Sequence, residues 1–238
     1  MYRGRHVSAI IPCHDEAGFI GRTIVGLPTW VDRIIVVDDA SNDGTAEQAR
    51  ALRDPRVEVL QLTHNVGVGG AIVRGYHAVL ATDGDLVLVT NGDAQMDGHE
   101  VPELLRPLVE DRADLVKGNR LLCPGTRDNI PVLRRAGVHV FSMMTRVATG
   151  YAHVGDSQSG YHAVTASALR RLELDSLWPR YGFPNDLLMQ AARAGLRVQD
   201  RPVRAIYGDE VSGLKVRHAF YPVGWLLLRG MARRLTSR

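Results

Sequence analysis

The stretch IIVVDDASNDGT, residues 34–45, decides the fold of this chain. Its β-branched run stops abruptly at Asp38 and Asp39, which are followed by turn-forming residues. The pattern predicts a buried strand with two carboxylates at its carboxyl end, the edge at which open α/β sheets bind ligands. A second strand, residues 86–90, runs into NGDAQMD, residues 91–97, in the same way. Two acid-tipped strands in one sheet predict a site for a sugar, a ribose or a metal-bound diphosphate.

Apolar periodicity along the rest of the chain predicts alternating strands and helices. This order is typical of an α/β fold with a mostly parallel sheet flanked by helices. A long polar loop is expected at residues 119–131. The expected strands are residues 7–11, 34–37, 57–62, 86–90, 114–117, 197–200 and 203–206. One expected helix is opened by residues 65–70 and runs through residue 80. The other expected helices are residues 17–27, 45–52, 101–110, 136–149, 167–172 and 185–194.

Length and composition indicate one large domain. The chain has 238 residues, of which 45% are hydrophobic and 23% charged, so it is long enough for one large α/β domain and short for two. We expect a domain at residues 1–212 and a basic amphipathic tail at 213–238. A net charge of +3 suits phosphates, nucleic acid or an anionic membrane. The sequence lacks the interleaved aromatic and basic residues of a nucleic-acid-binding module, so no nucleic-acid partner is expected.

The cysteines and the termini bear on the compartment. Cys13 and Cys123 have the spacing of neither a zinc site nor a disulfide framework, which favours a reducing cytoplasm. Residues 1–6 contain no apolar signal core. No apolar run approaches the ~20 residues that a spanning helix needs. We therefore expect a cytoplasmic protein, with peripheral contact at the inner face of the membrane as a further expectation.

Three strand endings occur in a recognisable order. The first strand runs into PCHDE, residues 12–16, and the later two run into DDASNDGT, residues 38–45, and NGDAQMD, residues 91–97. Over roughly residues 7–212 this order resembles the family 2 glycosyltransferases, and most of all the polyprenyl-phosphate sugar transferases of the dolichol-phosphate mannose synthase type. The resemblance implies a GT-A fold, a divalent metal (Mg²⁺ or Mn²⁺), and inverting transfer of a hexose from a GDP- or UDP-sugar to a polyprenyl phosphate.

The resemblance assigns the nucleotide sugar to the first two strand endings. Asp38 and Asp39 can accept hydrogen bonds from ribose hydroxyls or a base N–H, and the resemblance adds Pro12, His14 and Glu16 to this role. Helix capping and turn formation are the alternative reading of the acidic segment, and they account for Ser41, Asn42 and Asp43.

A glycine-rich segment, residues 67–70, follows the third strand. A dinucleotide fingerprint would follow the first strand instead, so a Rossmann dehydrogenase is disfavoured. The small residues are expected to bring backbone N–H groups at the helix start, including that of Gly70, close to the nucleotide, together with Arg74.

The third strand ending is the predicted metal site. Asp93 is the expected ligand because hard divalent cations that bridge phosphates prefer oxygen, and Gln95 can add an amide oxygen. The family usually has Asp-x-Asp here, whereas this chain has Asn91 in place of the first carboxylate. Asn91 is assigned to the nucleotide sugar, by a hydrogen bond or through water. Asp97 is either a helix cap or a functional residue.

Arginines after the fifth expected strand are assigned to the acceptor. By resemblance, Arg120, Arg134 and Arg135 bind the acceptor phosphate, and Arg127 lies in the same loop. Guanidinium groups match phosphate oxygens geometrically. A solvated surface is the alternative for scattered arginines.

Two aspartates are the predicted catalytic residues. Asp156 opens DSQSGYHA, residues 156–163, which matches a family segment along the sugar and acceptor pocket. Asp186 occupies the place of a base in many inverting members, and a helix N-cap is its alternative role. A phosphate acceptor is already ionised near neutral pH, so Asp186 would position the acceptor or the sugar rather than act as a strong base.

The C-terminal segment is basic and amphipathic. Trp225, Leu228, Ala232 and Leu235 fall on one helical face, which suits a membrane interface. Core packing, or contact between two copies of the chain as in a homodimer, is the alternative. Two rival functions remain open: transfer to a hydroxyl of a soluble sugar or specialised metabolite, and nucleotide-sugar binding without catalysis, suggested by Asn91.

Overall fold

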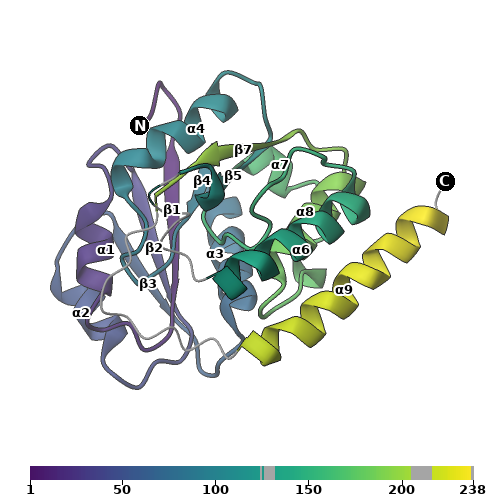
Figure 1. The fold of residues 1–238 in the computed structure, drawn as a ribbon. Coiled ribbons are helices and arrows are strands. Elements are labelled where there is room, and N and C mark those ends of the chain that lie inside the picture. Colours follow the sequence, from purple (N-terminus) through teal and green to yellow (C-terminus); the bar gives the residue numbers. More distant parts are fainter. Residues whose placement is uncertain (124, 126–131, 205–215, 237–238) are drawn as a thin grey trace.

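The computed structural model describes residues 1–123, 125, 132–204 and 216–236. Among them seven strands form one sheet in the order β3-β2-β1-β4-β6-β5-β7 (Figure 1). All neighbouring strands are parallel except β6, which runs antiparallel to both β4 and β5. The strands are β1 (Val7–Cys13), β2 (Arg33–Asp38), β3 (Val57–Gln61), β4 (Leu86–Val89), β5 (Leu115–Asn119), β6 (His162–Thr165) and β7 (Val198–Pro202).

Helices cover both faces of the sheet. Alternate side chains of β1 point to opposite faces, so that Ile11 packs with α1 and α4 while Ile10 packs with α3 and α8. The helices are α1 (Ile20–Gly26), α2 (Thr45–Ala51), α3 (Val68–Leu80), α4 (Val101–Val109), α6 (Val132–Thr149), α7 (Ala166–Leu169), α8 (Phe183–Arg193) and α9 (Val216–Thr236). Short 3₁₀ turns are η1 (Gly98–Glu100), η2 (Arg120–Leu122) and η3 (Leu174–Ser176).

The predicted α/β class and mostly parallel sheet are confirmed, although several elements differ in detail from their expected ranges. The strand β6 was not expected, because its four residues, His-Ala-Val-Thr, are too few to show an alternating pattern. Helix α6 begins at Val132, four residues before the expected start at 136. Val203 and Arg204 do not continue the strand that was expected at 203–206, and residues 205–206 lie outside the described residues.

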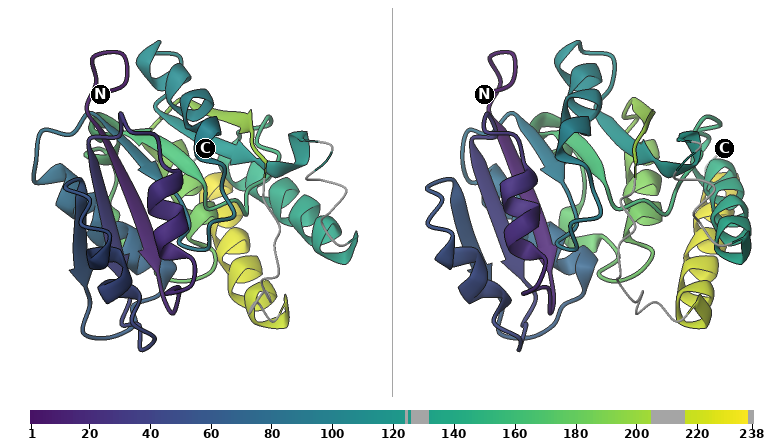
Figure 2. Two further views of the ribbon diagram at one scale, coloured as in Figure 1. Left: turned by 90° about the vertical axis from the view of Figure 1, so that its left-hand side faces the viewer. Right: turned by 60° about the vertical axis from the view of Figure 1, so that its left-hand side comes forward.

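Helix α9 packs beside α6, on the side of the molecule away from α1 and α2 (Figures 1 and 2). Val223, Leu226 and Leu227 are buried in a cluster that also holds Phe141 of α6 and Met189 of α8. Among the described residues of the predicted apolar face of α9, Trp225, Leu228 and Ala232 are exposed. One face of α9 therefore belongs to the fold and the other faces outward. The division at residue 212 stays a prediction.

The end of α6 is fastened to α9 by one arginine. Arg234 Nη1 donates to the Val147 carbonyl at 2.6 Å, close to the end of the helix at Thr149. A cation at a helix C-terminus satisfies carbonyls that lack intrahelical partners and complements the helix dipole.

We therefore expect Arg234→Ala to lower the free energy of unfolding by about 1 kcal/mol, as is typical for loss of one such hydrogen bond. Chemical denaturation measures the change. Arg229→Ala, which removes an exposed arginine from the same helix, is the matched control and should cost about 0.5 kcal/mol or less. Equal losses in the two variants would show that the contact with α6 contributes nothing specific.

Candidate active site

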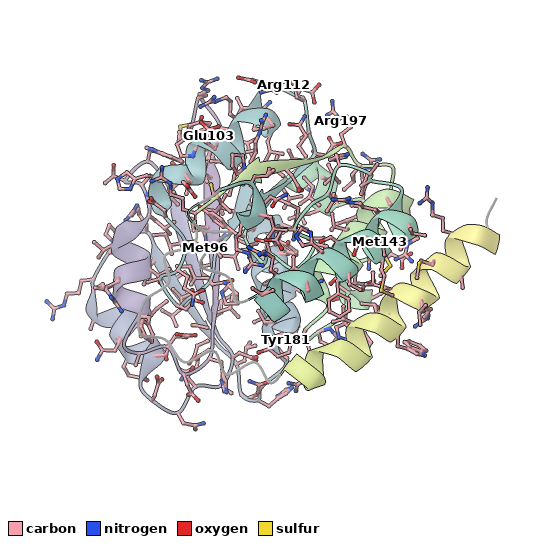
Figure 3. The ribbon with its side chains drawn as sticks, in the orientation of Figure 1. Met96, Glu103, Arg112, Met143, Tyr181 and Arg197 are labelled. Atoms are coloured by element: carbon pink, nitrogen blue, oxygen red, sulfur yellow. The ribbon has the colours of Figure 1, made fainter. Side chains whose placement is uncertain are left out.

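The loops after β1, β2 and β4 lie together at the carboxyl edge of the sheet. Each contains one non-glycine residue with a left-handed backbone: Asp15 (φ 56°), Ala40 (φ 57°) and Ala94 (φ 56°). Such residues store backbone strain, which is concentrated at functional sites. Met96, in the loop after β4, lies near the middle of the view in Figure 3, whereas Arg112 and Arg197 lie along its upper edge, where β5 and β7 begin.

Asp38 ends β2 and is fully buried. Its Oδ1 accepts hydrogen bonds from the backbone N–H of Ser41, at 3.1 Å, and from the Ser41 hydroxyl. Its Oδ2 is buried and accepts no hydrogen bond from the residues that the structure describes. Because a buried acceptor without a donor is costly, this oxygen is suited to a donor group on a ligand.

Asp39 binds the backbone of the loop before α3. Its two carboxylate oxygens accept hydrogen bonds from the backbone N–H groups of Val66, at 2.7 Å, and Gly67, at 2.8 Å. Asp39 therefore positions this loop, and its predicted contact with the nucleotide stays a prediction. The turn-forming role of Asp43 is observed, since its carboxylate accepts from the N–H groups of Ala17 and Thr45.

The glycine-rich start of α3 approaches protein rather than a nucleotide. A Cβ on Gly69 would lie 2.3 Å from the Trp178 carbonyl oxygen, so only glycine allows this contact. The Gly70 N–H, which was expected to face the nucleotide, donates to the Pro179 carbonyl at 3.0 Å. That part of the prediction is corrected, because the helix end is covered by the segment before α8. Arg74 is exposed on α3.

The predicted metal ligands follow β4. Asp93 Oδ1 accepts the Gln95 N–H at 3.1 Å, and the Thr23 hydroxyl donates to the Gly92 carbonyl at 2.9 Å, which fastens the loop to α1. Within the described residues no group of three His, Cys, Asp or Glu side chains could hold a metal. One carboxylate with neighbouring amides fits a hard cation that takes its remaining oxygens from substrate phosphate and water.

Asp97 lies in the loop after β4, and the predicted residues of the PCHDE segment lie at the end of β1 and in the loop after it. Asp97 caps η1 by accepting the His99 N–H at 2.9 Å, which is the capping alternative. Pro12 is buried at the end of β1, His14 is exposed beside it, and Glu16 is half-buried with its N–H on Thr45 Oγ1 at 2.8 Å.

The part of the edge that was predicted to bind the acceptor contains a buried ion pair. Arg120 donates from Nε at 2.7 Å and from Nη2 at 3.1 Å to the two carboxylate oxygens of Asp156, which is fully buried. Burial by itself would raise the pKa of Asp156, but the adjacent guanidinium outweighs it and holds the pKa below its usual value. Asp156 therefore stays ionised and orients Arg120. Arg135 is half-buried on α6; the side chain of Arg134 and all of Arg127 lie outside the described residues.

Asn185 and Asp186 face different surroundings. Asn185 is fully buried, and its amide donates to Thr145 Oγ1 at 2.8 Å and to Ser157 Oγ at 3.1 Å. Asp186 Oδ2 accepts the Trp178 N–H at 2.9 Å, and its side chain lines a cavity of about 420 Å³ between α8 and α9. Asn185, which was not among the predicted site residues, is joined to the loop of Asp156 through Ser157. The catalytic role of Asp186 stays a prediction.

Several buried groups were missed from the sequence. His162 Nδ1 lies 2.6 Å from the Gly160 carbonyl and its Nε2 lies 2.5 Å from the Tyr76 hydroxyl. Burial and the charge of Lys117 lower the pKa of His162 to about 3, so its neutral ring donates from Nδ1 and accepts at Nε2. Asp200 Oδ2 accepts the Gly155 N–H at 2.7 Å. The contacts of His162 with Tyr76 and of Asp200 with Gly155 join segments that are 86 and 45 positions apart in the sequence, so no local sequence signal indicates them.

Comparison with known proteins agrees with the order of the motifs. Residues 8–173 match the family described as glycosyl transferase family 2. The undecaprenyl-phosphate mannosyltransferase of Micrococcus luteus is 34% identical over 202 residues, which cover 83% of this chain and 82% of that protein. The polyprenol monophosphomannose synthase of Mycolicibacterium smegmatis is 31% identical over 238 residues, with 88% of each chain covered.

A solved structure shares the fold. The glucosyl-3-phosphoglycerate synthase of Mycobacterium tuberculosis, crystallised with Mn²⁺, uridine diphosphate and glucosyl-3-phosphoglycerate, has a TM-score of 0.73 at 23% identity. The alignment covers 96% of this chain and 81% of that chain. At this identity the similarity concerns the fold alone.

Proposed function

The chain belongs to glycosyl transferase family 2, and from this premise we propose that it transfers a hexose from a nucleotide diphosphate sugar to a polyprenyl phosphate. The observation that carries the proposal is the division of the carboxyl edge into two ends. The end around Asp38 and Asp93 is acidic, whereas the other end contains the guanidinium of Arg120, which is oriented by Asp156. A donor held through hydroxyls, base and metal suits the first end, and an anionic acceptor suits the second.

The donor would lie over the loops after β1, β2 and β4. The unpartnered Oδ2 of Asp38 is suited to a base N–H or a ribose hydroxyl. Asp93 and Gln95 would hold Mg²⁺ or Mn²⁺, with Asn91 beside them, and the cation would neutralise the leaving diphosphate. Replacement of a usual carboxylate by Asn91 lowers the negative charge at this position.

The acceptor needs positioning more than activation. A phosphate oxygen of the acceptor forms the new bond to the anomeric carbon as the bond to the diphosphate breaks, with inversion. Because that phosphate is already ionised, no proton has to be removed. Arg120, with Arg134 and Arg135 on α6, would bind the phosphate, and Asp186 would orient the acceptor or the sugar.

Access to a lipid-linked acceptor suggests peripheral contact with a membrane. No helix among the described residues has the length and apolarity needed to span a bilayer. Trp225 and Leu228 are exposed on α9, and the Arg229 guanidinium lies 5.6 Å from the centre of the Trp225 ring. An aromatic side chain beside a cation suits the interface of an anionic membrane. Arg234 points to α6 instead and is not counted in this contact.

We expect the double variant Trp225→Ser/Leu228→Ser to bind anionic vesicles at least about tenfold more weakly, because each side chain loses apolar burial in the interface. Co-sedimentation with phosphatidylglycerol vesicles at low and high salt measures the loss. Val25→Ser/Leu52→Ser is the matched control, since it removes two exposed apolar side chains from the α1 and α2 side. Equal binding by both variants and the unaltered protein would remove the membrane role of α9.

A transfer assay tests the function itself. The protein is incubated with radiolabelled GDP- and UDP-sugars, Mn²⁺ or Mg²⁺, and either a short polyprenyl phosphate or the corresponding polyprenol. Label should reach the phosphate and not the alcohol, because the alcohol lacks the charge that Arg120 would bind. Transfer to neither lipid, with donor binding intact, would overturn the proposed acceptor and favour a soluble one.

A further inference from the structure

Lys117, a buried residue of β5, contacts the loop at residues 155–160, which lies between the two ends of the site. It is on β5, opposite His162 of β6 and Asp200 of β7 in the strand registers, and its side chain is fully buried. The ammonium group donates to the backbone carbonyl of Ser159. The contact joins residues that are 42 positions apart in the sequence.

The charged and titratable groups around Lys117 balance one another. Asp156 in the loop and Asp200 on β7 favour its charged form, Arg120 after β5 opposes it, and His162 on β6 is neutral. Burial raises the pKa of Asp200, and hydrogen bonds from Gly155 and Asn119 oppose that rise. With Lys117, Arg120 and both carboxylates ionised, the cluster has no net charge. Removal of any one member leaves a buried charge without compensation, which is costly.

Stability alone does not account for this cluster. A buried ionic network is often no more stable than an apolar core of the same volume. The hydroxyl of Ser159 and Oδ1 of Asp200 are also buried without hydrogen-bond partners among the described residues. Networks with unmet polar groups are retained mainly at functional sites.

The loop at residues 155–160 reaches both ends of the site. Near its start, Asp156 holds Arg120. At its other end, a Cβ on Gly160 would lie 3.1 Å from Asn91 Oδ1, so the backbone at Gly160 contacts the loop after β4. Lys117 holds the loop between these two points. A shift of the Ser159 carbonyl would therefore move the acceptor side relative to the donor side.

We propose that Lys117 is a positioning residue that acts through the 155–160 loop. It keeps Arg120 and Asn91 at a fixed position relative to each other, so that the acceptor phosphate is aligned with the donor sugar. This inference rests on the proposed function for its effect on transfer, but not for its effect on the loop. Positioning errors of about 1 Å can lower rates about a hundredfold without loss of substrate binding.

The charge of Lys117 also gives the proposal a pH signature. Burial lowers the pKa of Lys117 to about 8, against the raising effect of Asp156 and Asp200. Above that pH the amine is neutral, and its hydrogen bond to the Ser159 carbonyl is no longer strengthened by the positive charge. At pH values between about 8 and the ordinary lysine pKa of 10.5, the unfolded chain binds more protons at this residue than the folded chain does. A rise in pH through this range therefore increases the contribution of Lys117 to the free energy of unfolding. Transfer should therefore fall above pH 8 without a loss of stability from Lys117.

The decisive experiment compares Asp200→Asn with Lys117→Met/Asp200→Asn. The double variant removes one cation and one carboxylate, so the cluster stays neutral and the protein is expected to fold. Asp200→Asn alone leaves one excess positive charge, so the two variants are compared under conditions in which circular dichroism shows that both are folded. Near pH 7, kcat with polyprenyl phosphate should be about tenfold or more lower in the double variant than in Asp200→Asn, with an unchanged dissociation constant for the nucleotide diphosphate. The unaltered protein should lose kcat above pH 8, whereas the double variant should show no such decrease. Equal kcat in the two variants near pH 7 would overturn the proposal.

A second measurement does not depend on transfer. Hydrogen exchange at the amides of Ser157 and Ser159 should be faster in the double variant than in Asp200→Asn, while amides of β1 and β4 exchange equally. Equal exchange at the loop would overturn the role of Lys117 even if transfer is observed. If the unaltered protein transfers no sugar to polyprenyl phosphate but the loop exchange changes as expected, the proposed function fails and the positioning role of Lys117 remains supported.

Discussion

Replacing Asp93 by asparagine should lower sugar transfer by about 100- to 1000-fold, the usual cost of losing one group that stabilises charge on a leaving group. The carboxylate of Asp93 is the acidic group of the NGDAQ segment, in a loop fastened to α1 through Thr23. Asparagine keeps the shape and an acceptor for the Gln95 N–H, so the fold should persist. Calorimetry of nucleotide diphosphate binding with and without Mn²⁺ should show that the metal no longer strengthens binding.

Asp97→Asn is the matched control for this prediction. It removes one carboxylate charge from the same loop, and asparagine can still cap η1. Transfer and Mn²⁺-dependent binding should stay close to those of the unaltered protein.

In the opposite direction, Asn91→Asp should tighten Mn²⁺ binding by adding charge beside the cation. Unchanged metal dependence in Asp93→Asn would exclude Asp93 as a ligand.

The second large effect concerns Arg120, whose replacement by alanine should affect both stability and acceptor binding. Asp156 would be left buried without its cation, and breaking a buried pair in this way costs about 3–5 kcal/mol. Loss of the charge-assisted contact should also raise the acceptor KM about tenfold to hundredfold. Urea unfolding and steady-state kinetics measure the two effects.

A companion variant separates the two roles of Arg120. Arg120→Ala/Asp156→Asn removes both charges, so most of the stability should return while the acceptor KM stays high. Arg197→Ala breaks exposed ion pairs with Asp111, at 2.6 Å, and Asp114, at 2.9 Å, and should destabilise the fold much less than Arg120→Ala does. If the acceptor KM recovers in the double variant, Arg120 does not bind the acceptor. If Arg120→Ala is no less stable than Arg197→Ala, the buried pair is not a structural element.

The same pair has a defined acid dependence. The folded pKa of Asp156 lies below its ordinary value of 3.8, so the pair stabilises the fold fully above that pH. Its contribution disappears as the pH falls from the ordinary value through the lower folded value. Acid unfolding of Asp156→Asn should therefore be less steep in this range than that of the unaltered protein.

The sequence predicted the positions of Asp38 and Asp93 better than the surroundings of Arg120, for a physical reason. In β2 and β4 an apolar run stops at or shortly before an acid, which is a local pattern, and both acids lie at the expected edge of the sheet. The role of Asp39 was harder to predict, because hydrogen bonds to Val66 and Gly67, which are 27 and 28 residues away, determine it. Gly70 was misjudged for a similar reason, since its N–H meets Pro179.

The surroundings of Lys117, Arg120 and Asn185 are formed by segments that only the folded chain brings together. Lys117 looks like any lysine in a short apolar strand, and its burial follows from contact with the 155–160 loop. Asn185 looks like a helix cap, and its partner Ser157 lies 28 residues away. No periodicity or local motif indicates such contacts. The Arg120 guanidinium was predicted to face a phosphate, and its ion pair with Asp156 was not foreseen.

The antiparallel strand β6 has a consequence for how the chain is synthesised. Strands β1 to β4 pair only with one another at first, so this half of the sheet can form once residue 89 has left the ribosome. The edge of β4 stays unpaired until β6, residues 162–165, has been synthesised. Before that point β5 also has no described strand partner. A nascent chain therefore carries an apolar edge that can pair with other chains. Translation through residues 90–165 is the interval in which a chaperone would protect this protein most.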